Sequence, residues 1–163
     1  MKILIVTQYF WPENFQINDF AKELVSKGND VSVLTGIPNY PNGKFFKGYS
    51  LFNKKKEYYQ GINIYRSPLI PRGSNSKIKL FLNYISFAFL ASLRLVFIKK
   101  KFDKIIVYAP SPITVGIPGI IAKYKFNAPV YLWVQDLWPE SILSAGGITN
   151  SYIIKIINKL TIL

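Results

Sequence analysis

The chain has 163 residues, enough for one domain of ordinary size, and half of them are hydrophobic, so it is expected to fold around a core. It carries 21 Lys and Arg against 8 Asp and Glu, a net charge of +13, which favours an anionic partner. It contains no Cys and no His, which excludes disulfides, thiolate metal sites and catalysis by either residue.

The N-terminal part of the chain predicts a strand, a helix and a second strand. Residues 2–7 are a continuous apolar run, typical of a strand that is buried on both faces in a parallel sheet. Apolar residues then recur at helical spacing, at Ile17, Phe20, Ala21, Leu24 and Val25. Gly28 ends this helix, and a second apolar strand covers residues 31–35. A strand–helix–strand unit of this kind indicates an α/β fold with a parallel sheet.

The middle of the chain departs from this alternation. Residues 36–56 are rich in Pro, Gly and Lys and predict a long basic loop, and residues 57–68 predict two short strands around Gly61. Residues 80–93 then carry no charge, but this run is shorter than the about 20 apolar residues of a transmembrane helix. Two interpretations stay open for it: a helix buried against the sheet, or a helix that also dips into a bilayer.

The C-terminal part predicts two more strands, at residues 104–108 and 130–134. Between them, Ser111 is expected to cap a helix that has Pro112 in its first turn, while Pro118 either kinks this helix or marks its true start. A last helix is predicted from Thr149 onward. Together these elements predict a Rossmann-like, mostly parallel sheet with helices on both faces.

Ligands of an open parallel sheet bind beyond the carboxyl ends of its strands, so the segments that follow the predicted strands form the candidate site. These segments offer carboxylates, amides, a hydroxyl and aromatic rings, a mixture that suits the hydroxyls and the apolar ring face of a sugar. The candidate substrate-binding residues are Gln8, Trp11, Asn14, Asn39, Tyr40, Ser111, Gln135, Trp138 and Glu140.

Structural roles remain open for several of these side chains. Asp136 follows a predicted strand at the place where a ligand would bind, but it could also cap a turn. Glu13 could favour the dipole of the following helix, and Trp11 and Trp138 could be packing residues. The sequence shows no dinucleotide fingerprint, no phosphate-binding loop and no metal-ligand spacing, so neither a cofactor nor a metal is predicted.

Several segments resemble the family-four glycosyltransferases of the GT-B fold, in the branch that builds O-antigen, capsule and colanic acid. The resemblance is greatest to the L-fucosamine transferase type, and the matching segments are residues 1–13, 18–28, 33–41 and 134–141. It implies two Rossmann-like domains, of which residues 1–163 are the N-terminal, acceptor-binding one. The C-terminal domain, which binds the nucleotide-sugar through a Glu-x7-Glu motif, would then be absent from this chain, and the chain alone would be inactive.

The same resemblance implies a reaction. A sugar would be transferred with retention and without a metal from a nucleotide-sugar donor, expected to be UDP-linked, to a saccharide on undecaprenyl diphosphate. Asp136 and Glu13 are the implied catalytic residues, and Glu13 and Asn14 would lie near the donor phosphates. Many family members carry His at the position of Gln135, so no role that depends on that His is expected here.

The basic residues predict a membrane as the anionic partner. They would meet lipid headgroups or the acceptor diphosphate, although the lysines at positions 54–56 could equally be a solvated face. The N-terminal apolar run is too short for a signal peptide, so a cytoplasmic protein on the inner face of the cytoplasmic membrane is expected. The expected membrane-binding residues are Lys54, Lys55, Lys56, Lys99, Lys100 and Lys101.

Two other functions compete with the transferase. A non-catalytic lipid-binding domain would need the same basic residues and apolar helix, but not the segment at Asp136. A nucleic-acid-binding domain would be basic enough, but the chain has Arg only at Arg66, Arg72 and Arg94 and shows no nucleic-acid-binding motif, so no nucleic-acid partner is expected.

Overall fold

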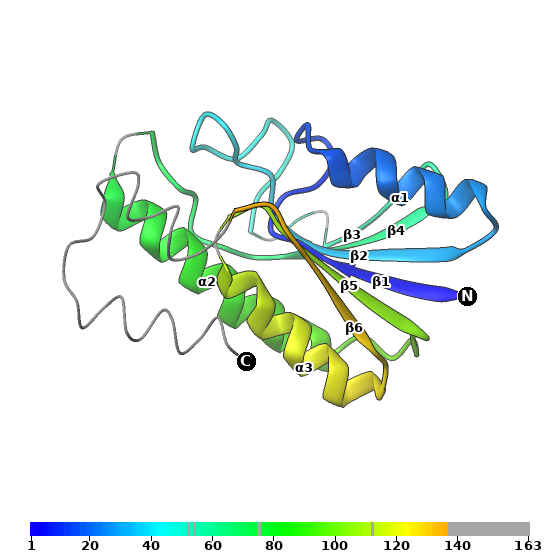
Figure 1. Cartoon of the computed structure of the whole chain (residues 1–163). Coiled ribbons are helices and arrows are strands. Elements are labelled where there is room, and N and C mark those ends of the chain that lie inside the picture. Colours follow the sequence, from blue (N-terminus) through cyan, green and yellow to red (C-terminus); the bar gives the residue numbers. More distant parts are fainter. Residues whose placement is uncertain (52, 54, 75, 112, 137–163) are drawn as a thin grey trace.

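The computed structural model describes residues 1–51, 53, 55–74, 76–111 and 113–136. They form a six-stranded sheet in the order β3-β4-β2-β1-β5-β6, which is parallel except for the antiparallel pair β3–β4 (Figure 1). The strands are β1 (Lys2–Val6), β2 (Asp30–Gly36), β3 (Lys56–Tyr59), β4 (Ile62–Ser67), β5 (Lys104–Ala109) and β6 (Val130–Val134). The predicted α/β, Rossmann-like fold is confirmed.

Helices cover both faces of the sheet. The helix α1 (Gln16–Ser26) lies on one face, and α2 (Lys77–Val96) and α3 (Gly116–Phe126) lie side by side on the other (Figure 1). Side chains of a strand alternate between faces, so Ile3 and Ile5 join the core under α1, whereas Leu4 and Val6 join the core under α2 and α3. This double burial is the reason why β1 is apolar throughout.

The strands predicted at residues 2–7, 31–35, 104–108 and 130–134 are all present. The strand pair expected around Gly61 is the hairpin β3–β4, whose turn residues Gln60 and Gly61 have φ angles of 46° and 83°. Positive φ at both central positions is typical of the type I′ turn, which matches the twist of the strands on either side.

The start of α3 differs from the prediction. A short 3₁₀ turn, η1 (Ile113–Val115), precedes α3, and Val115 is the N-cap residue of that helix. Ser111 therefore does not cap α3. Pro118 lies in the first turn of α3, where proline is tolerated because the first amides of a helix have no partner within it. The helix predicted from Thr149 lies outside the described residues.

The uncharged stretch forms part of the helix α2, which has one buried face and one exposed face. One face packs on the sheet through Phe87, Ala91 and Leu95, which are fully buried. The opposite face is exposed and apolar, and only 28% of the most apolar 18-residue window is buried. By length and hydropathy α2 is the one helix in the described part of the chain that could cross a membrane, a test that core helices also pass.

Candidate functional site at the carboxyl ends of the strands

Five strands bring their carboxyl ends to one edge of the sheet. The strands β1, β2, β4, β5 and β6 are parallel, so the segments that follow β1, β2, β5 and β6 share this edge, which we call the carboxyl rim (Figure 1). Backbone hydrogen bonds continue past the strand ends, from Gly36 N to Gln8 O (3.1 Å) and from Gln135 N to Ala109 O (3.1 Å). The predicted placement of Gln8 and Asp136 on the same edge is therefore confirmed.

The carboxylate of Glu13 joins the first two segments of the rim. Its Oε1 accepts hydrogen bonds from the backbone amides of Asn39 (2.8 Å) and Tyr40 (2.7 Å), and its Oε2 accepts one from Phe10 N (3.3 Å). The residue is 2% exposed, so no substrate reaches the carboxylate without displacing these amides. This geometry favours a positioning role for Glu13 over the catalytic role that the family resemblance implies.

Burial of Glu13 has an electrostatic consequence. Removal from water raises the pKa of its carboxyl to about 7, although the three backbone amides and Arg66 act in the opposite direction. The ionised and neutral forms are therefore close in free energy at neutral pH, and the loop that follows β2 is held by a group that titrates there.

A network of side-chain amides lies directly behind the rim. Gln8 Nε2 donates to Asn83 Oδ1 (2.6 Å), and Asn83 Nδ2 donates to Ile70 O (2.6 Å) and, at 3.4 Å, to Asn39 Oδ1. Gln8, Asn39 and Asn83 are each at most 1% exposed. These contacts tie α2 to the segments after β1 and β2, so Gln8 and Asn39, predicted to bind substrate, are placed to orient the rim and not to form its surface.

The loop after β2 and the loop before α2 meet at two glycines. Gly73 N donates to Gly43 O (3.0 Å), and a Cβ atom at Gly43 would lie 2.1 Å from the carbonyl oxygen of Gly73, which leaves no room for a side chain. The backbone amide of Arg72 donates to Asn39 Oδ1 (3.1 Å), and the Arg72 guanidinium lies 4.9 Å from the centre of the Tyr40 ring. Arg72 and Tyr40 are thus held side by side.

Tyr84, on α2, connects the remaining parts of the rim. Burial raises the pKa of its hydroxyl, and Arg72, Ser111, Tyr9 and Asp136 all lie close enough to influence that pKa. Asp136 also acts on Tyr108, whose pKa is raised chiefly by burial. Asp136 itself is exposed, so its carboxylate is available to a ligand. Ser111 and Asp136, both predicted site residues, therefore gather around a tyrosine that the sequence did not single out.

The buried side chain of Arg66 connects β3 to the end of β2 and to the segment after β1. Arg66 donates from Nε to Glu57 Oε2 (2.6 Å), from Nη1 to Gly36 O (3.1 Å) and from Nη2 to Trp11 O (2.5 Å). The Trp11 ring stacks on Tyr59 with 4.1 Å between ring centres. These contacts favour the packing interpretation for Trp11 over contact with substrate.

The other predicted residues are more dispersed. Asn14 and Gln135 are exposed, and Trp138, Glu140 and Lys54 lie outside the described residues. Lys55, Lys56, Lys99 and Lys101 are exposed. Lys100 instead donates to Asp30 (2.7 Å) and to Ser32 (3.2 Å) near the amino end of β2, so its charge is partly neutralised within the protein.

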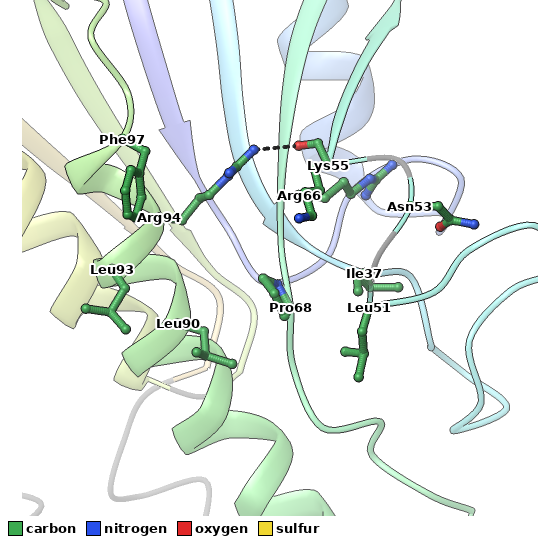
Figure 2. Close-up of a pocket in the computed structure, with 10 residues that line it drawn as sticks. All are labelled: Ile37, Leu51, Asn53, Lys55, Arg66, Pro68, Leu90, Leu93, Arg94 and Phe97. Atoms are coloured by element: carbon green, nitrogen blue, oxygen red, sulfur yellow. Dashed lines mark hydrogen bonds between the residues drawn. The ribbon is translucent and has the colours of Figure 1, made fainter.

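An apolar pocket lies between the C-terminal half of α2 and the loop before β3, and it reaches the rim only at Ile37, directly after β2. Figure 2 shows its ten described lining residues and the hydrogen bond from Arg94 Nη2 to Lys55 O (3.1 Å). Its volume is about 200 Å³. The rim residues Asn39, Tyr84 and Asp136 are not among those that line it. Leu93 and Phe97 line the pocket and also belong to the exposed face of α2.

Four rim residues escaped the sequence analysis: Tyr9, Arg72, Asn83 and Tyr84. Asn83 was visible as an interruption of the uncharged stretch, and a buried Asn in an apolar helix requires hydrogen-bond partners. Arg72 lies in a loop and Tyr84 in a helix, so the rule about strand ends does not select them. Within the described part of the chain, no group of three or more Asp or Glu side chains gathers as a metal site would require.

Comparison with known proteins gives one distant relative. Residues of this chain are 28% identical over 151 positions, 90% of the chain, to an Escherichia coli K12 protein that carries the provisional name colanic acid biosynthesis glycosyl transferase WcaI. The match spans 37% of the length of that protein. No protein-family model matches the chain. The chain is thus distantly similar to a protein named as a glycosyltransferase of polysaccharide synthesis.

Proposed function

We propose that this chain is the acceptor-binding half of a glycosyltransferase that adds a sugar to a lipid-linked saccharide in bacterial surface polysaccharide synthesis. The observation that carries the proposal is the carboxyl rim, where segments distant in sequence bring Tyr9, Tyr40, Arg72, Tyr84 and Asp136 together. Hydroxyl, aromatic, cationic and carboxylate groups at one sheet edge suit a phosphorylated saccharide. The distant similarity to a protein named as a colanic acid glycosyltransferase supports the same conclusion.

The proposal assigns different tasks to the two carboxylates. Asp136 is exposed at the end of β6 and acts on the acceptor or donor sugar, whereas Glu13 holds the loops that form the rim. The donor is a nucleotide-sugar, UDP-linked and with L-fucosamine as the first sugar to test, and transfer proceeds with retention. A second, C-terminal domain binds this donor. The chain matches only 37% of the length of the relative, which leaves room for such a domain in that protein.

A transfer assay tests the function. The natural protein that contains this chain is incubated with radiolabelled UDP- and GDP-sugars and a polyprenyl-diphosphate saccharide, and one donor is expected to give a labelled lipid product. The 163-residue chain alone is expected to bind the saccharide acceptor without transferring sugar. A folded protein that transfers none of the sugars would contradict the proposal, and it would then favour the alternative, a non-catalytic lipid-binding domain.

We further propose that the exposed face of α2 and α3 lies against the anionic inner face of the cytoplasmic membrane. The exposed fraction of the side chains is 73% for Ile78, 62% for Phe89 and 64% for Val96, and Phe81, Leu82, Ile85 and Leu93 extend the same helix face. Ile117, Ile120, Ile121 and Tyr124 on the adjacent α3 are exposed as well. Such an area is larger than scattered surface apolar residues explain, and exposed lysines near it favour anionic lipid.

Vesicle binding tests this placement. Phe89→Glu is expected to weaken binding of the chain to anionic vesicles by about tenfold or more, because a charge replaces a side chain that would be buried in lipid. Tyr58→Glu is the matched control, since Tyr58 is 73% exposed on β3, outside the proposed face. Lys99→Gln with Lys101→Gln should also weaken binding and reduce its dependence on salt, which screens charges over about 10 Å at 0.1 M.

Two results would count against the membrane. Equal binding to neutral and anionic vesicles would remove the electrostatic part of the argument. If analytical ultracentrifugation shows a dimer that Phe89→Glu converts to a monomer, with no change in vesicle binding, a second copy covers this face.

A further inference from the structure

The guanidinium of Arg72 contacts no acceptor group in the described part of the chain. The other two arginines are engaged: Arg66 with Glu57 and two backbone carbonyls, and Arg94 with the carbonyl of Lys55. For Arg72, only the backbone amide makes a hydrogen bond, and the side chain lies over the Tyr40 ring. Residues 1–51, 55–74 and 76–111 thus hold this cation in place without forming an ion pair with it, the condition for binding an anion with little loss of entropy.

A buried hydroxyl without a partner lies beside this cation. Tyr9 is 4% exposed, and its ring packs against Phe15 and Tyr40 at 5.1 and 5.6 Å. Its oxygen lies near the Tyr84 hydroxyl but makes no hydrogen bond of normal geometry with any described residue. Burial raises the pKa of Tyr9 above its ordinary value, so this hydroxyl keeps its proton and stays a donor. A buried donor without an acceptor is costly unless a ligand supplies one.

A cavity next to Arg72 in the chain carries further positive charge. Pro71 and Gly73, the neighbours of Arg72, line this cavity of about 560 Å³, which also contains Lys44 and Lys79. None of the described residues that line this cavity is a carboxylate. Two lysines in a cavity next to Arg72, with no carboxylate among the described residues that line it, suit a ligand with more than one negative charge better than a neutral sugar.

We propose that Arg72, together with the hydroxyls of Tyr9 and Tyr84, forms a binding site for a diphosphate ester at the carboxyl rim. Arg72 supplies a planar pair of donors to phosphate oxygens, and the two tyrosines donate O–H groups to the same anion. Lys44 and Lys79, which line the neighbouring cavity, are the proposed partners of the second phosphate.

The arrangement of α2 indicates that the bound diphosphate belongs to a lipid-linked molecule. Tyr84 of α2 faces the rim, whereas its neighbour Ile85 and the nearby Phe81 lie on the exposed apolar face of the same helix. A diphosphate bound at Arg72 would thus lie close to a surface suited to hydrocarbon. This choice of source rests on the proposed function, but the diphosphate site itself does not.

Calorimetric titration of the 163-residue chain with inorganic pyrophosphate tests the site. Arg72→Gln is expected to weaken binding by about tenfold or more, and Tyr9→Phe by about threefold or more. Arg94→Gln is the matched control, because it removes the same charge from a residue that lines the apolar pocket instead. Circular dichroism melting establishes that each variant is folded. Equal affinity in Arg72→Gln and Arg94→Gln, or no saturable binding by the unaltered chain, would overturn the site.

Competition then identifies the source of the phosphate. Farnesyl diphosphate should displace pyrophosphate if the ligand is lipid-linked, and a UDP-sugar should displace it if the site serves the donor. Displacement by neither would overturn the assignment to a diphosphate ester. If the natural protein transfers sugar but Arg72→Gln binds pyrophosphate as tightly as the unaltered chain, the diphosphate site is wrong and the proposed function stands. Conversely, Arg72-dependent pyrophosphate binding by a protein that transfers no sugar would leave the site and remove the proposed function.

Discussion

Asp136→Asn is expected to lower the turnover of the natural protein by about 100-fold or more, while acceptor binding and thermal stability change little. The carboxylate is exposed at the end of β6 and lies within electrostatic range of Tyr84 and Tyr108, so it can interact with a bound sugar. Asn keeps the shape of the side chain and its ability to accept hydrogen bonds from a turn, but removes the charge. Steady-state kinetics with the preferred nucleotide-sugar measure the effect.

The matched control for this substitution is Asp103→Asn. Asp103 is also exposed, but it lies before β5 at the opposite edge of the sheet, where its carboxylate accepts from the backbone amide of Lys2 (2.7 Å). Its loss should leave turnover unchanged. Normal turnover in Asp136→Asn would show that Asp136 merely caps its turn, and the catalytic assignment would then be withdrawn.

Glu13→Gln is expected to change how stability depends on pH. In the folded protein the carboxyl pKa is about 7, above its unfolded value of 4.5, so the folded state holds the proton more tightly. Stability from this group is therefore present below pH 4.5 and is lost as pH rises toward 7, by about 3 kcal/mol in total. The variant lacks this loss, so the stability of Glu13→Gln relative to the unaltered chain should rise by about 2–3 kcal/mol between pH 5 and pH 8.

Urea unfolding at these two pH values measures the difference. Glu23→Gln is the control, because the Glu23 side chain is 61% exposed and contacts Lys27 and Ser26 on the surface of α1. A constant difference between Glu13→Gln and the unaltered chain at both pH values would mean that the Glu13 carboxyl titrates normally.

Four of the five parallel strands, β1, β2, β5 and β6, could be predicted because each is a short apolar run with turn residues after it. Burial on both faces removes the polar alternation in β1 and β2, whereas β6 is largely exposed and was recognised from its apolar residues alone. The parallel arrangement then places the segment at Gln8 and the segment at Asp136 on one edge without further information.

The direction in which side chains point could not be predicted in the same way. Glu13 follows a strand and looked like a residue of the site surface, but the amides of Asn39 and Tyr40 lack other partners and turn its carboxylate inward. Tyr84 reaches the rim because α2 packs against the sheet, and Arg72 reaches it because the loop before α2 contacts the loop after β2. Such packing depends on contacts between Asn83, Gln8 and Asn39, which are far apart in the sequence.

The contact between Gly43 and Gly73 has a consequence for the evolution and engineering of this protein. A side chain at Gly43 would collide with the backbone of Gly73, and Gly73 has a φ of 67° that favours glycine, so these two residues let the loops that carry Tyr40 and Arg72 approach closely. The chain between Lys44 and Lys55 begins just past this contact, and Lys44, Lys47 and Lys55, its described lysines, are exposed. Insertions and replacements there are tolerated at small entropic cost. Libraries that aim to change what the chain binds should therefore vary this stretch and leave the two glycines intact.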